Sequence, residues 1–411
     1  MTAKILLICQ HFYPDMVSTG LHMTELTTEW KKLYPDVEIS VFTGENAREH
    51  LDQPFKRYDN YQNINIFRVK NIGKQHRGLF QRLLFSLGFM GKTFLFLLNN
   101  WNKYNLLLTT TNPPFIGMVV WFFNLVYNVP YVIIVYDIYP QILDKMGILK
   151  KNSLLYTAWG WFNLSFYNRA SKIISIGSDM TKVIKAQISK KNWSKIELID
   201  NWSDKNKVFP IPASINQFVI KNGFQGKKIL LYSGTIGSTH NIEDILEAAS
   251  QLNAYDKIIF LFIGAGAKAS LVQKYIDTSG CGNVKLLPFQ PIETLSDTLS
   301  SATISFVCLN SSFTGLSVPS KTYAVMAAKV PIIAMMDDDA AISEIVIKYE
   351  CGVVWNSRSK VSLSSVILGM VHDDSWLAEM GQNGYDAFLN NFNINTAVDK
   401  YNNVVRKALV K

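Results

Sequence analysis

The chain has 411 residues, of which 48% are hydrophobic, and these values exclude a disordered protein and favour two folded domains. Its formal net charge is +9, but no nucleic-acid-binding motif accompanies the basic residues, so we expect no nucleic acid as a partner. The four cysteines form no CxxC pair, and the chain enters a predicted strand at residue 5 without a signal peptide. These features predict buried free thiols and a cytoplasmic protein.

Apolar strands alternate with helical segments through the first half of the chain. The expected strands are Ile5–Cys9, Val37–Phe42, Ile64–Val69, Leu106–Thr110, Tyr131–Val135 and Lys172–Ser175. The expected helices are Leu21–Lys32, Leu79–Asn99, Phe115–Tyr127, Leu154–Arg169 and Asp179–Ala186. This alternation predicts an α/β domain with a doubly wound parallel sheet.

A glycine loop made of Ser18, Thr19 and Gly20 precedes the first expected helix. Gly20 either lies at a ligand or only permits a turn, because glycine serves both purposes. His11 and His22 flank this loop, and we interpret both as structural rather than catalytic. No group of His, Cys and carboxylate residues has metal-ligand spacing, so we expect no metal ion.

A stretch without any Asp or Glu runs from residue 60 to residue 136. It combines basic residues, among them Arg77, Arg82 and Lys92, with phenylalanines and leucines at helical spacing. This combination is typical of a helix in an anionic membrane interface and predicts a membrane patch. Arg82 and Lys92 interrupt the apolar run, which disfavours a transmembrane span. The alternative is a solvated basic face above an ordinary core helix.

Asp137 follows the buried run Val132–Val135, at the end of an expected parallel strand. A carboxylate there could orient an acceptor hydroxyl or help to remove its proton, which makes Asp137 the candidate catalytic residue. Asp137 also precedes Ile138, Tyr139 and Pro140, so a helix-capping role is an equal alternative.

Prolines at positions 210 and 212 interrupt the alternation, which restarts at Lys228. The expected strands of the second half are Ile229–Tyr232, Ile258–Ile263, Val284–Leu287, Ile304–Cys308, Ile332–Met335 and Gly352–Val354. We therefore predict an N-terminal domain at 1–205, a linker at 206–227, a C-terminal domain at 228–390 and a final helical segment at 391–411. Two such halves imply a ligand cleft between them.

Three segments of the second half are typical of phosphate binding. Glycine turns follow two expected strands, and a Ser-Lys pair stands just ahead of an expected helix. The candidate donor-binding residues are Gly234, Gly237, Ser238, Thr239, Gly264, Gly266, Ser320 and Lys321. A helix start offers free N–H groups and a partial positive charge, so a diphosphate could bind there. The alternatives are glycines needed only for turn geometry and a surface lysine.

Asp337, Asp338 and Asp339 follow another expected strand. Their carboxylates could bind a metal ion, but their position favours a solvated loop.

The order of several motifs resembles retaining glycosyltransferases of family 4, and more narrowly the bacterial fucosaminyltransferases of surface-polysaccharide synthesis. In the second half these motifs are YSGTIG, FIGAGAK and VPSKTYAVMAAKVPIIA. In the first half they are ILLICQHFYPDMVSTGLHMTEL and VYDIYPQILDKMG. The resemblance covers nearly the whole chain.

This resemblance implies a GT-B fold, in which two Rossmann-like domains face each other across a cleft and the final helix at 391–411 crosses back to the N-terminal domain. It implies a retaining enzyme of the hexosyltransferase type without metal or other cofactor. The implied donor is a nucleotide sugar such as UDP-N-acetylfucosamine. The implied acceptor is a lipid-linked saccharide of O-antigen or capsule synthesis, and the protein would bind peripherally to the inner face of the cell membrane.

Four positions depart from the broader family pattern. Thr235 and His240 stand where many members have Arg and Lys, and Leu316 and Ala324 stand where they have two glutamates. In those members the glutamates address the donor sugar and the ribose. Other contacts would have to replace them here.

Two alternative functions remain at this stage. The missing glutamates allow a non-catalytic protein that binds a nucleotide sugar or a partner. A nucleotide-sugar epimerase shares the GT-B fold, but the basic, aromatic N-terminal surface would have no use in it.

Overall fold

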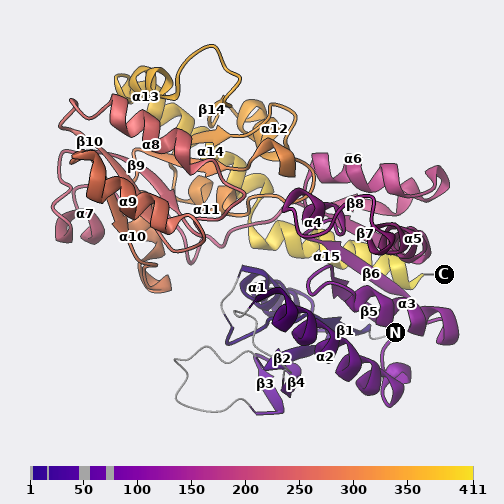
Figure 1. The fold of residues 1–411 in the computed structure, drawn as a ribbon. Helices are drawn as coiled ribbons and strands as arrows, with labels where there is room; N and C mark the ends of the chain where they lie inside the picture. Colours follow the sequence, from indigo (N-terminus) through magenta and orange to yellow (C-terminus); the bar gives the residue numbers. More distant parts are fainter. Residues whose placement is uncertain (1–2, 16–17, 46–55, 71–77, 411) are drawn as a thin grey trace. The chain divides into compact units, whose positions relative to one another are not determined.

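The computed structural model describes residues 3–15, 18–45, 56–70 and 78–410. The chain forms two compact units (Figure 1). The first comprises Met1–Asp200 and Ile394–Lys411, and the second comprises Asn201–Asn393. Each is built on a largely parallel sheet with helices around it, which confirms the predicted α/β class with two Rossmann-like domains.

The sheet of the first unit has the strand order β3-β4-β2-β1-β5-β6-β7-β8. The strands are β1 (Lys4–Ile8), β2 (Glu38–Glu45), β3 (Tyr58–Tyr61), β4 (Ile64–Lys70), β5 (Leu106–Thr110), β6 (Tyr131–Val135), β7 (Lys172–Ser175) and β8 (Ile196–Leu198). Neighbouring strands run parallel, except the edge pair of β3 and β4. Every residue of β6 is buried, because helices cover both faces of such a sheet.

Helices surround this sheet and include the C-terminal one. They are α1 (Ser18–Leu33), α2 (Gly78–Leu98), α3 (Ile116–Tyr127), α4 (Gln141–Lys145), α5 (Leu154–Arg169), α6 (Ser178–Gln187) and α15 (Ile394–Leu409), with the 3-10 turns η1 (Trp101–Lys103) and η2 (Lys190–Lys195). The indole N–H of Trp30 on α1 donates to Asn402 Oδ1 on α15 at 3.2 Å. The Trp30 ring also packs against that of Tyr401, with 6.3 Å between centroids. Thus α15 is an integral part of the first unit.

The sheet of the second unit is parallel throughout and has the order β11-β10-β9-β12-β13-β14. Its strands are β9 (Lys228–Ser233), β10 (Ile258–Ile263), β11 (Val284–Leu287), β12 (Ile304–Cys308), β13 (Ile332–Met335) and β14 (Gly352–Trp355). Its helices are α7 (Gln217–Lys221), α8 (Ile242–Gln251), α9 (Ala269–Ser279), α10 (Leu295–Ser300), α11 (Lys321–Ala327), α12 (Ala341–Lys348), α13 (Leu363–Val371) and α14 (Asp374–Asn391), with η3 (Ile292–Thr294) and η4 (Ser311–Phe313).

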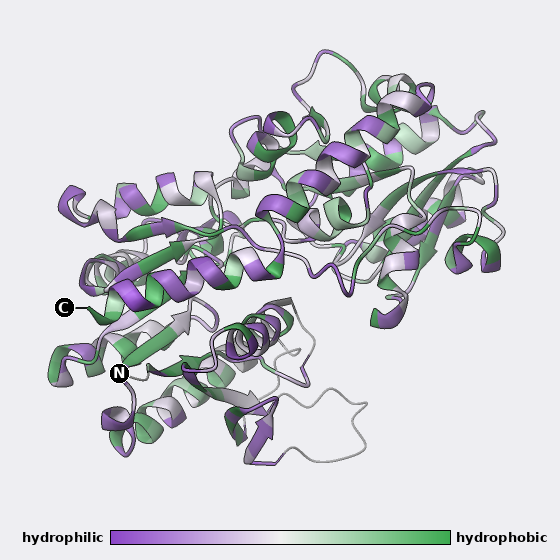
Figure 2. Cartoon of the chain, turned by 180° about the vertical axis from the view of Figure 1, so that it is seen from behind, coloured by the Kyte–Doolittle hydropathy of each residue, from purple (hydrophilic) through white to green (hydrophobic). Residues whose placement is uncertain are grey.

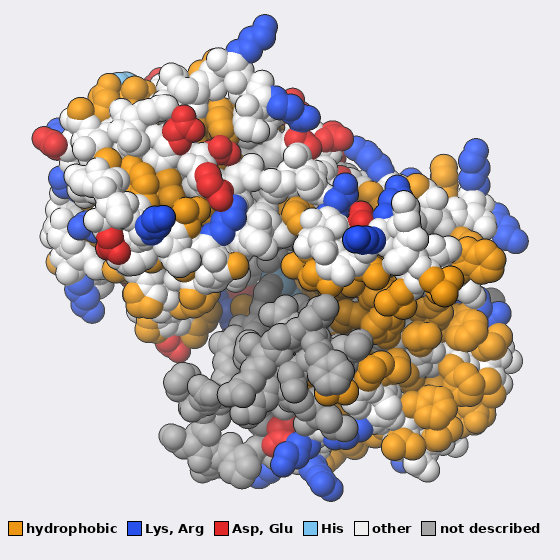
Figure 3. Space-filling model, viewed as in Figure 1, with side chains coloured by type: hydrophobic (Ala, Val, Ile, Leu, Met, Phe, Trp, Pro, Cys, Tyr) orange, Lys and Arg blue, Asp and Glu red, His pale blue; other side chains and the backbone are white. Residues whose placement is uncertain are grey.

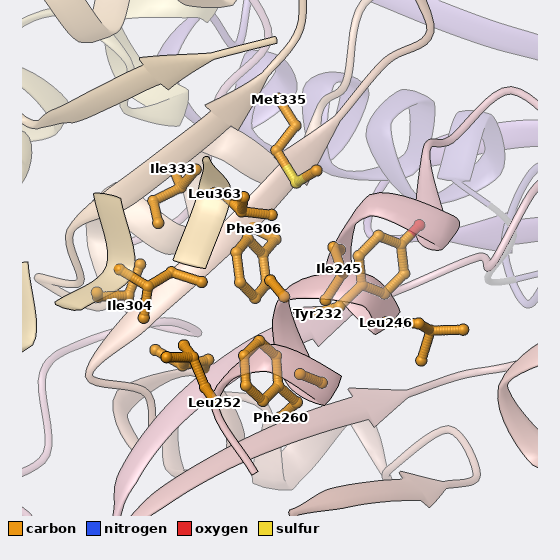
Figure 4. Close-up of a cluster of buried hydrophobic side chains, with 14 of the residues drawn as sticks. Tyr232, Ile245, Leu246, Leu252, Phe260, Ile304, Phe306, Ile333, Met335 and Leu363 are labelled. Carbon is orange, nitrogen blue, oxygen red and sulfur yellow. The ribbon is translucent and has the colours of Figure 1, made fainter. Parts of the chain in front are cut away.

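The core of the second unit lies between the sheet and helices α8 and α13 (Figure 4). Phe260 on β10 and Phe306 on β12 stack at 6.3 Å between ring centroids, and both are fully buried. Ile245 and Leu363 pack against them from the two helices. In both units most strands are hydrophobic, while the helices combine hydrophobic and hydrophilic residues (Figure 2). This amphipathic pattern places one helix face on the core.

The segment 206–227, which the prolines mark as a linker, is packed within the second unit. The Phe209 N–H donates to Ser296 Oγ at 3.2 Å. The buried Asn216 caps α7 through Val219 N and donates its amide to the Asp297 carbonyl at 2.8 Å. Prolines interrupt regular structure here, but side-chain hydrogen bonds fix the segment on α10. The unit boundary therefore lies at residues 200 and 201 rather than at 205 and 228.

Candidate functional site

The strand order of the second unit reverses between β9 and β12. The chain adds β10 and β11 on one side of β9, and β12, β13 and β14 on the other. Loops leave the carboxyl ends of β9 and β12 in opposite directions at such a point, and ligands of open α/β sheets bind there. The predicted donor-binding residues lie on the loops after β9, β10 and β12 and at the start of α11.

Lys321 is the first residue of α11. Its Nζ lies 3.7 Å from the centroid of the Tyr232 ring, and an ideal Cβ on Gly234 would be 4.0 Å from the same nitrogen. The nitrogen is buried and has no hydrogen-bond partner among the residues that the structure describes. Burial lowers the pKa of Lys321 from 10.5 to about 8, while the Coulomb interaction with Cys308 raises it slightly. A buried, unpaired ammonium group is costly, and an anion beside it would remove that cost.

His240 lies beside this ammonium group and cannot act as a second cation at neutral pH. Burial, and to a lesser extent the Lys321 charge, lowers the pKa of His240 from 6.5 to about 3. The Tyr232 hydroxyl lies 2.6 Å from His240 Nδ1 and 2.7 Å from the Thr235 carbonyl oxygen. These bonds connect strand β9 to the loop that follows it. Consequently position 240, where many of the glycosyltransferases that the sequence resembles carry a Lys, is neutral here.

Gly264 and Gly266 hold the loop after β10 against the loop after β9. Their φ angles are 141° and 152°, which side-chain-bearing residues rarely adopt. A Cβ on Gly264 would overlap the Gly234 carbonyl, and one on Gly266 would lie 2.5 Å from the Ile236 oxygen. Backbone bonds from Gly234 N to Ile263 O and from Ile236 N to Ala265 O, both 2.9 Å, complete the contact. Loop packing thus accounts for both glycines without a ligand.

The turn Gly237–His240 carries Ser238 and Thr239. Ser238 is exposed, and the Thr239 carbonyl accepts the Asn310 N–H at 2.8 Å. This bond joins the loop after β9 to the loop after β12. Ser320 occupies the N-cap position of α11 but makes no capping hydrogen bond with its side chain. The structure therefore brings all three predicted segments to one edge of the sheet.

Lys268 was not among the predicted site residues, although it directly follows the second glycine turn. Its Nζ donates to the His240 carbonyl and to Glu243 Oε2, both at 2.8 Å. It thereby locks the turn that carries Ser238 and Thr239 to the N-terminus of α8. The basic residue after FIGAGA was the available signal.

Neither position of the missing glutamates carries a carboxylate, and Leu316 is buried. The Thr314 hydroxyl, on the same loop, lies 3.4 Å from Asp337 Oδ2. Asp337 also pairs with Arg358 at 2.5 Å, and the Asn356 amide lies 3.3 Å from Asp338 Oδ1. Within the described ranges, no cluster of three or more His, Cys, Asp or Glu residues is arranged to bind a metal ion.

In the first unit, Asp137 follows β6, and its N–H donates to Thr111 Oγ1 at 3.1 Å. The N-cap position of α4 is occupied by Pro140 rather than by Asp137. Burial raises the pKa of Tyr139, and the negative charge of Asp137 raises it further. The Tyr139 ring stacks on Trp159 at 5.6 Å between centroids. A small pocket, which aromatic side chains of α5 help to line, includes Thr111 and Tyr139 and lies next to this loop.

Gly20 lies in the first turn of α1, with Ser18 and Thr19. An ideal Cβ on Gly20 would lie 2.5 Å from the Asp15 carbonyl oxygen, so a close backbone approach requires glycine. His11 Nδ1 and Asp15 Oδ2 are 2.6 Å apart in a buried pair that fixes the preceding loop. The Ser18 side chain lies outside the described residues.

The predicted membrane patch is only partly described. Arg77 lies outside the described residues; Arg82 lies on α2, but its side chain is likewise outside them. Lys92 donates its ammonium group to the Lys70 carbonyl. None of the helices in the described ranges combines the length and hydropathy that crossing a bilayer requires.

The fold is that of GT-B proteins, as solved structures show. It is similar to sucrose-phosphate synthase from Thermosynechococcus elongatus, with a TM-score of 0.76 and 15% identity over 98% of both chains. Anabaena Alr3699/HepE in complex with UDP-glucose gives a TM-score of 0.72 and 15% identity, covering 98% of this chain and 99% of that one. WaaG, a glycosyltransferase involved in lipopolysaccharide biosynthesis, gives a TM-score of 0.68 and 11% identity, covering 96% of this chain and 98% of that one.

Residues 214–387, nearly the whole second unit, match the family model of glycosyl transferases group 1. The probable glycosyltransferase WbjE of Pseudomonas aeruginosa is 30% identical over 278 residues, which cover 68% of this chain and 66% of WbjE. The putative colanic acid biosynthesis glycosyl transferase WcaI of Escherichia coli K12 is 28% identical over 136 residues, 33% of this chain and 31% of WcaI. The matched segments thus span 66% of the length of one relative and about a third of the other.

Proposed function

We propose that this protein is a glycosyltransferase that moves a sugar from a nucleotide diphosphate donor to a lipid-linked saccharide in bacterial surface-polysaccharide synthesis. The observation that carries the proposal is the buried, unpaired ammonium group of Lys321 at the strand-order reversal of the second unit. The match of residues 214–387 to glycosyl transferases group 1 supports it. So does the similarity in fold to HepE, whose structure was solved with UDP-glucose.

On the donor side, Lys321 would face the diphosphate. When the sugar departs, negative charge grows on the leaving phosphate, and a preorganised cation in a dry site stabilises that charge. The backbone of the turn that carries Gly237, Ser238 and Thr239, together with Ser320, would supply hydrogen bonds. Gly234 would let the backbone approach the phosphates closely, while Gly264 and Gly266 would hold the two neighbouring loops together.

On the acceptor side, Asp137 would orient the attacking hydroxyl or accept its proton. It stands at the carboxyl end of β6, where open α/β sheets present catalytic side chains. The N-cap position of α4 is occupied by Pro140 rather than by Asp137, which supports the catalytic role over the capping alternative. Ser18, Thr19 and Gly20 would form the junction loop near the acceptor.

The finer details of the proposal rest on the motif resemblance. They are retention at the anomeric carbon, an N-acetylated deoxysugar such as N-acetylfucosamine on UDP, and O-antigen or capsule as the product. Action at the inner face of the cell membrane also belongs to the proposal. The relatives WbjE and WcaI support the general setting through their names, which are those of glycosyltransferases.

A non-catalytic nucleotide-sugar-binding protein is the second candidate. One observation favours it: the buried Leu316 and the half-buried Ala324 stand where the two glutamates that address donor sugar and ribose would lie in many members of the family that the sequence resembles. Such a protein would bind the nucleotide without turnover.

The test is a thermal-shift screen of UDP and UDP-sugars, followed by mass spectrometry of a lipid-linked saccharide incubated with the donor that binds. A ligand at about 100 times its dissociation constant stabilises the native state by about 2.7 kcal/mol. We expect stabilisation and a product larger by one sugar. Stabilisation without product favours the binding protein, and absence of any shift with all UDP compounds contradicts the proposal.

A further inference from the structure

Three neighbouring helices of the first unit expose an unusual number of large hydrophobic side chains. The apolar face, as we define it, consists of Leu87, Leu95 and Leu98 on α2, Met118, Leu125 and Val126 on α3, and Leu154, Leu155, Trp161 and Leu164 on α5. Figure 3 shows hydrophobic side chains gathered over the region of these helices. The α2 part of this face belongs to the membrane patch predicted from the sequence, whereas the exposed residues of α3 and α5 were not among the predicted patch residues.

The apolar face is continuous because α3 packs against both other helices. The rings of Phe94 on α2 and Phe122 on α3 lie 5.3 Å apart between centroids. On the other side, the Trp121 indole N–H donates to Ser165 Oγ on α5 at 3.0 Å. The exposed stripes of the three helices therefore form one surface rather than three isolated ones.

Two residues of α5 stand out in exposure: Leu154 is 86% exposed and Trp161 is 75% exposed. Single exposed hydrophobic residues are normal on any protein, but a contiguous patch marks a surface that something else covers. A tryptophan at the edge of an apolar patch is typical of the membrane interface, where its ring lies at the headgroup level.

The charges around the apolar face indicate which kind of partner binds there. Helices α2, α3 and α5 contain no Asp or Glu. The exposed Lys145, Lys150 and Lys151 precede α5, and Met146 and Ile148 between them are 44% and 40% exposed. A second copy of the chain in a symmetric pair would bring like charges together, whereas anionic headgroups complement them.

We propose that the apolar face and the lysine segment 145–151 dock the first unit on a bilayer that contains anionic phospholipids. The proposal rests on the proposed function and names the surface that would bind the membrane. Most of that surface lies on α3 and α5, with leucines rather than arginines contributed by α2. The docked segments adjoin the candidate catalytic loop: Asn163 of α5 donates to the Tyr139 carbonyl at 2.6 Å, two residues after Asp137. Docking would thus hold Asp137 at the bilayer surface, where the saccharide of a lipid-linked acceptor begins.

Vesicle sedimentation with the full-length protein tests the proposal. The probes are phosphatidylcholine vesicles with and without phosphatidylglycerol. The variant Leu154→Ser/Trp161→Ser should bind at least about tenfold more weakly, because burying each of these side chains contributes about 1.5–3 kcal/mol. The matched control is Ile215→Ser/Ile347→Ser, which removes side chains that are 61% and 59% exposed on the second unit and should bind like wild type.

A second variant tests the charge contribution. Lys150→Glu/Lys151→Glu should lose about tenfold or more in affinity for phosphatidylglycerol vesicles, since each juxtamembrane Lys contributes about 1 kcal/mol. Its binding to phosphatidylcholine vesicles should change little. Leu154, Trp161, Lys150 and Lys151 are exposed, so folding should be unaffected, and an unchanged circular dichroism spectrum and thermal transition of each variant verify this.

Wild-type protein that stays in the supernatant with phosphatidylglycerol vesicles at low salt would overturn the proposal. Undiminished vesicle binding by Leu154→Ser/Trp161→Ser would overturn it as well. Light scattering could instead show that the wild type is a dimer and that this variant is a monomer with unchanged vesicle binding. In that case a second copy of the chain, and not a bilayer, covers the face. Vesicle binding without UDP binding would leave the docking intact and contradict the proposed function, so the two failures are distinguishable.

Discussion

The two units present candidate sites of opposite character. In the second unit the site is built from backbone turns around one buried charge, Lys321, and it lies in the segment that matches glycosyl transferases group 1. In the first unit, one carboxylate, Asp137, adjoins an aromatic pocket and a broad apolar face outside that match. The difference teaches that the proposed donor site depends on loop geometry, which similar proteins can share. The proposed acceptor site depends instead on side chains at the helix surfaces.

The comparison predicts that substitutions in the two units affect different steps, and Asp137→Asn should have the largest effect. Because a positioned general base contributes about 100- to 10,000-fold, transfer should fall by about 100-fold or more. The dissociation constant for UDP should stay near that of wild type. The control Asp144→Asn, which removes a carboxylate from the neighbouring helix α4, should retain most of the activity. If Asp137→Asn lowers the unfolding temperature and keeps its activity, Asp137 is structural.

Lys321→Met tests the second unit, because this substitution should weaken nucleotide binding. A hydrogen bond to a charged group contributes about 1.5–3 kcal/mol, so UDP binding in calorimetry should weaken about 10- to 100-fold. Lys285→Met, which removes an exposed lysine on β11, is the matched control and should bind UDP normally. Equal affinities of the two variants would refute the donor role of Lys321.

Gly264→Ala tests whether the glycine turns are structural. The new methyl group would overlap the Gly234 carbonyl at a φ of 141°, so the free energy of unfolding should fall by about 2 kcal/mol or more. Gly282→Ala, where a Cβ meets nothing within 4 Å, should leave the thermal transition almost unchanged. A stable Gly264→Ala protein with lost UDP binding would instead assign this glycine to the ligand.

The smallest expected effect is that of Lys321→Met on the free energy of unfolding of the protein without ligand. The pKa of Lys321 is about 8 in the folded protein and 10.5 in the ordinary case, so the unfolded chain binds more protons between these pH values. The free energy of unfolding of wild type should therefore rise with pH across this window relative to Lys321→Met. At pH below 8, Lys321→Met should be as stable as wild type or more stable, by about 1–3 kcal/mol. Denaturant unfolding that shows a clear loss of stability instead would mean that Lys321 supports the fold.

The sequence allowed the parallel strands and the donor-side segments to be predicted, because buried strands and glycine turns have local signatures. Edge strand β3 (Tyr58–Tyr61) escaped prediction because its polar sequence has no apolar pattern. Likewise, the hydrogen bonds of Asn216 that hold the segment 206–227 depend on partners about 80 residues away. The apolar face on α5 escaped for a related reason, since LLYTAWGWFNLSFYNR does not reveal which of its hydrophobic residues face solvent.

The pH dependence of UDP binding is the most direct measurement of whether a buried cation defines the donor site. Calorimetry from about pH 7 to about pH 9.5 should show wild-type affinity falling above pH 8 toward that of Lys321→Met, because deprotonation removes the charge with which Lys321 binds the diphosphate. Lys321→Met should bind weakly and show no such decline, while Lys285→Met should follow wild type. A wild-type affinity that does not change through pH 8, or a decline that persists in Lys321→Met, would contradict the assignment of Lys321 to the diphosphate.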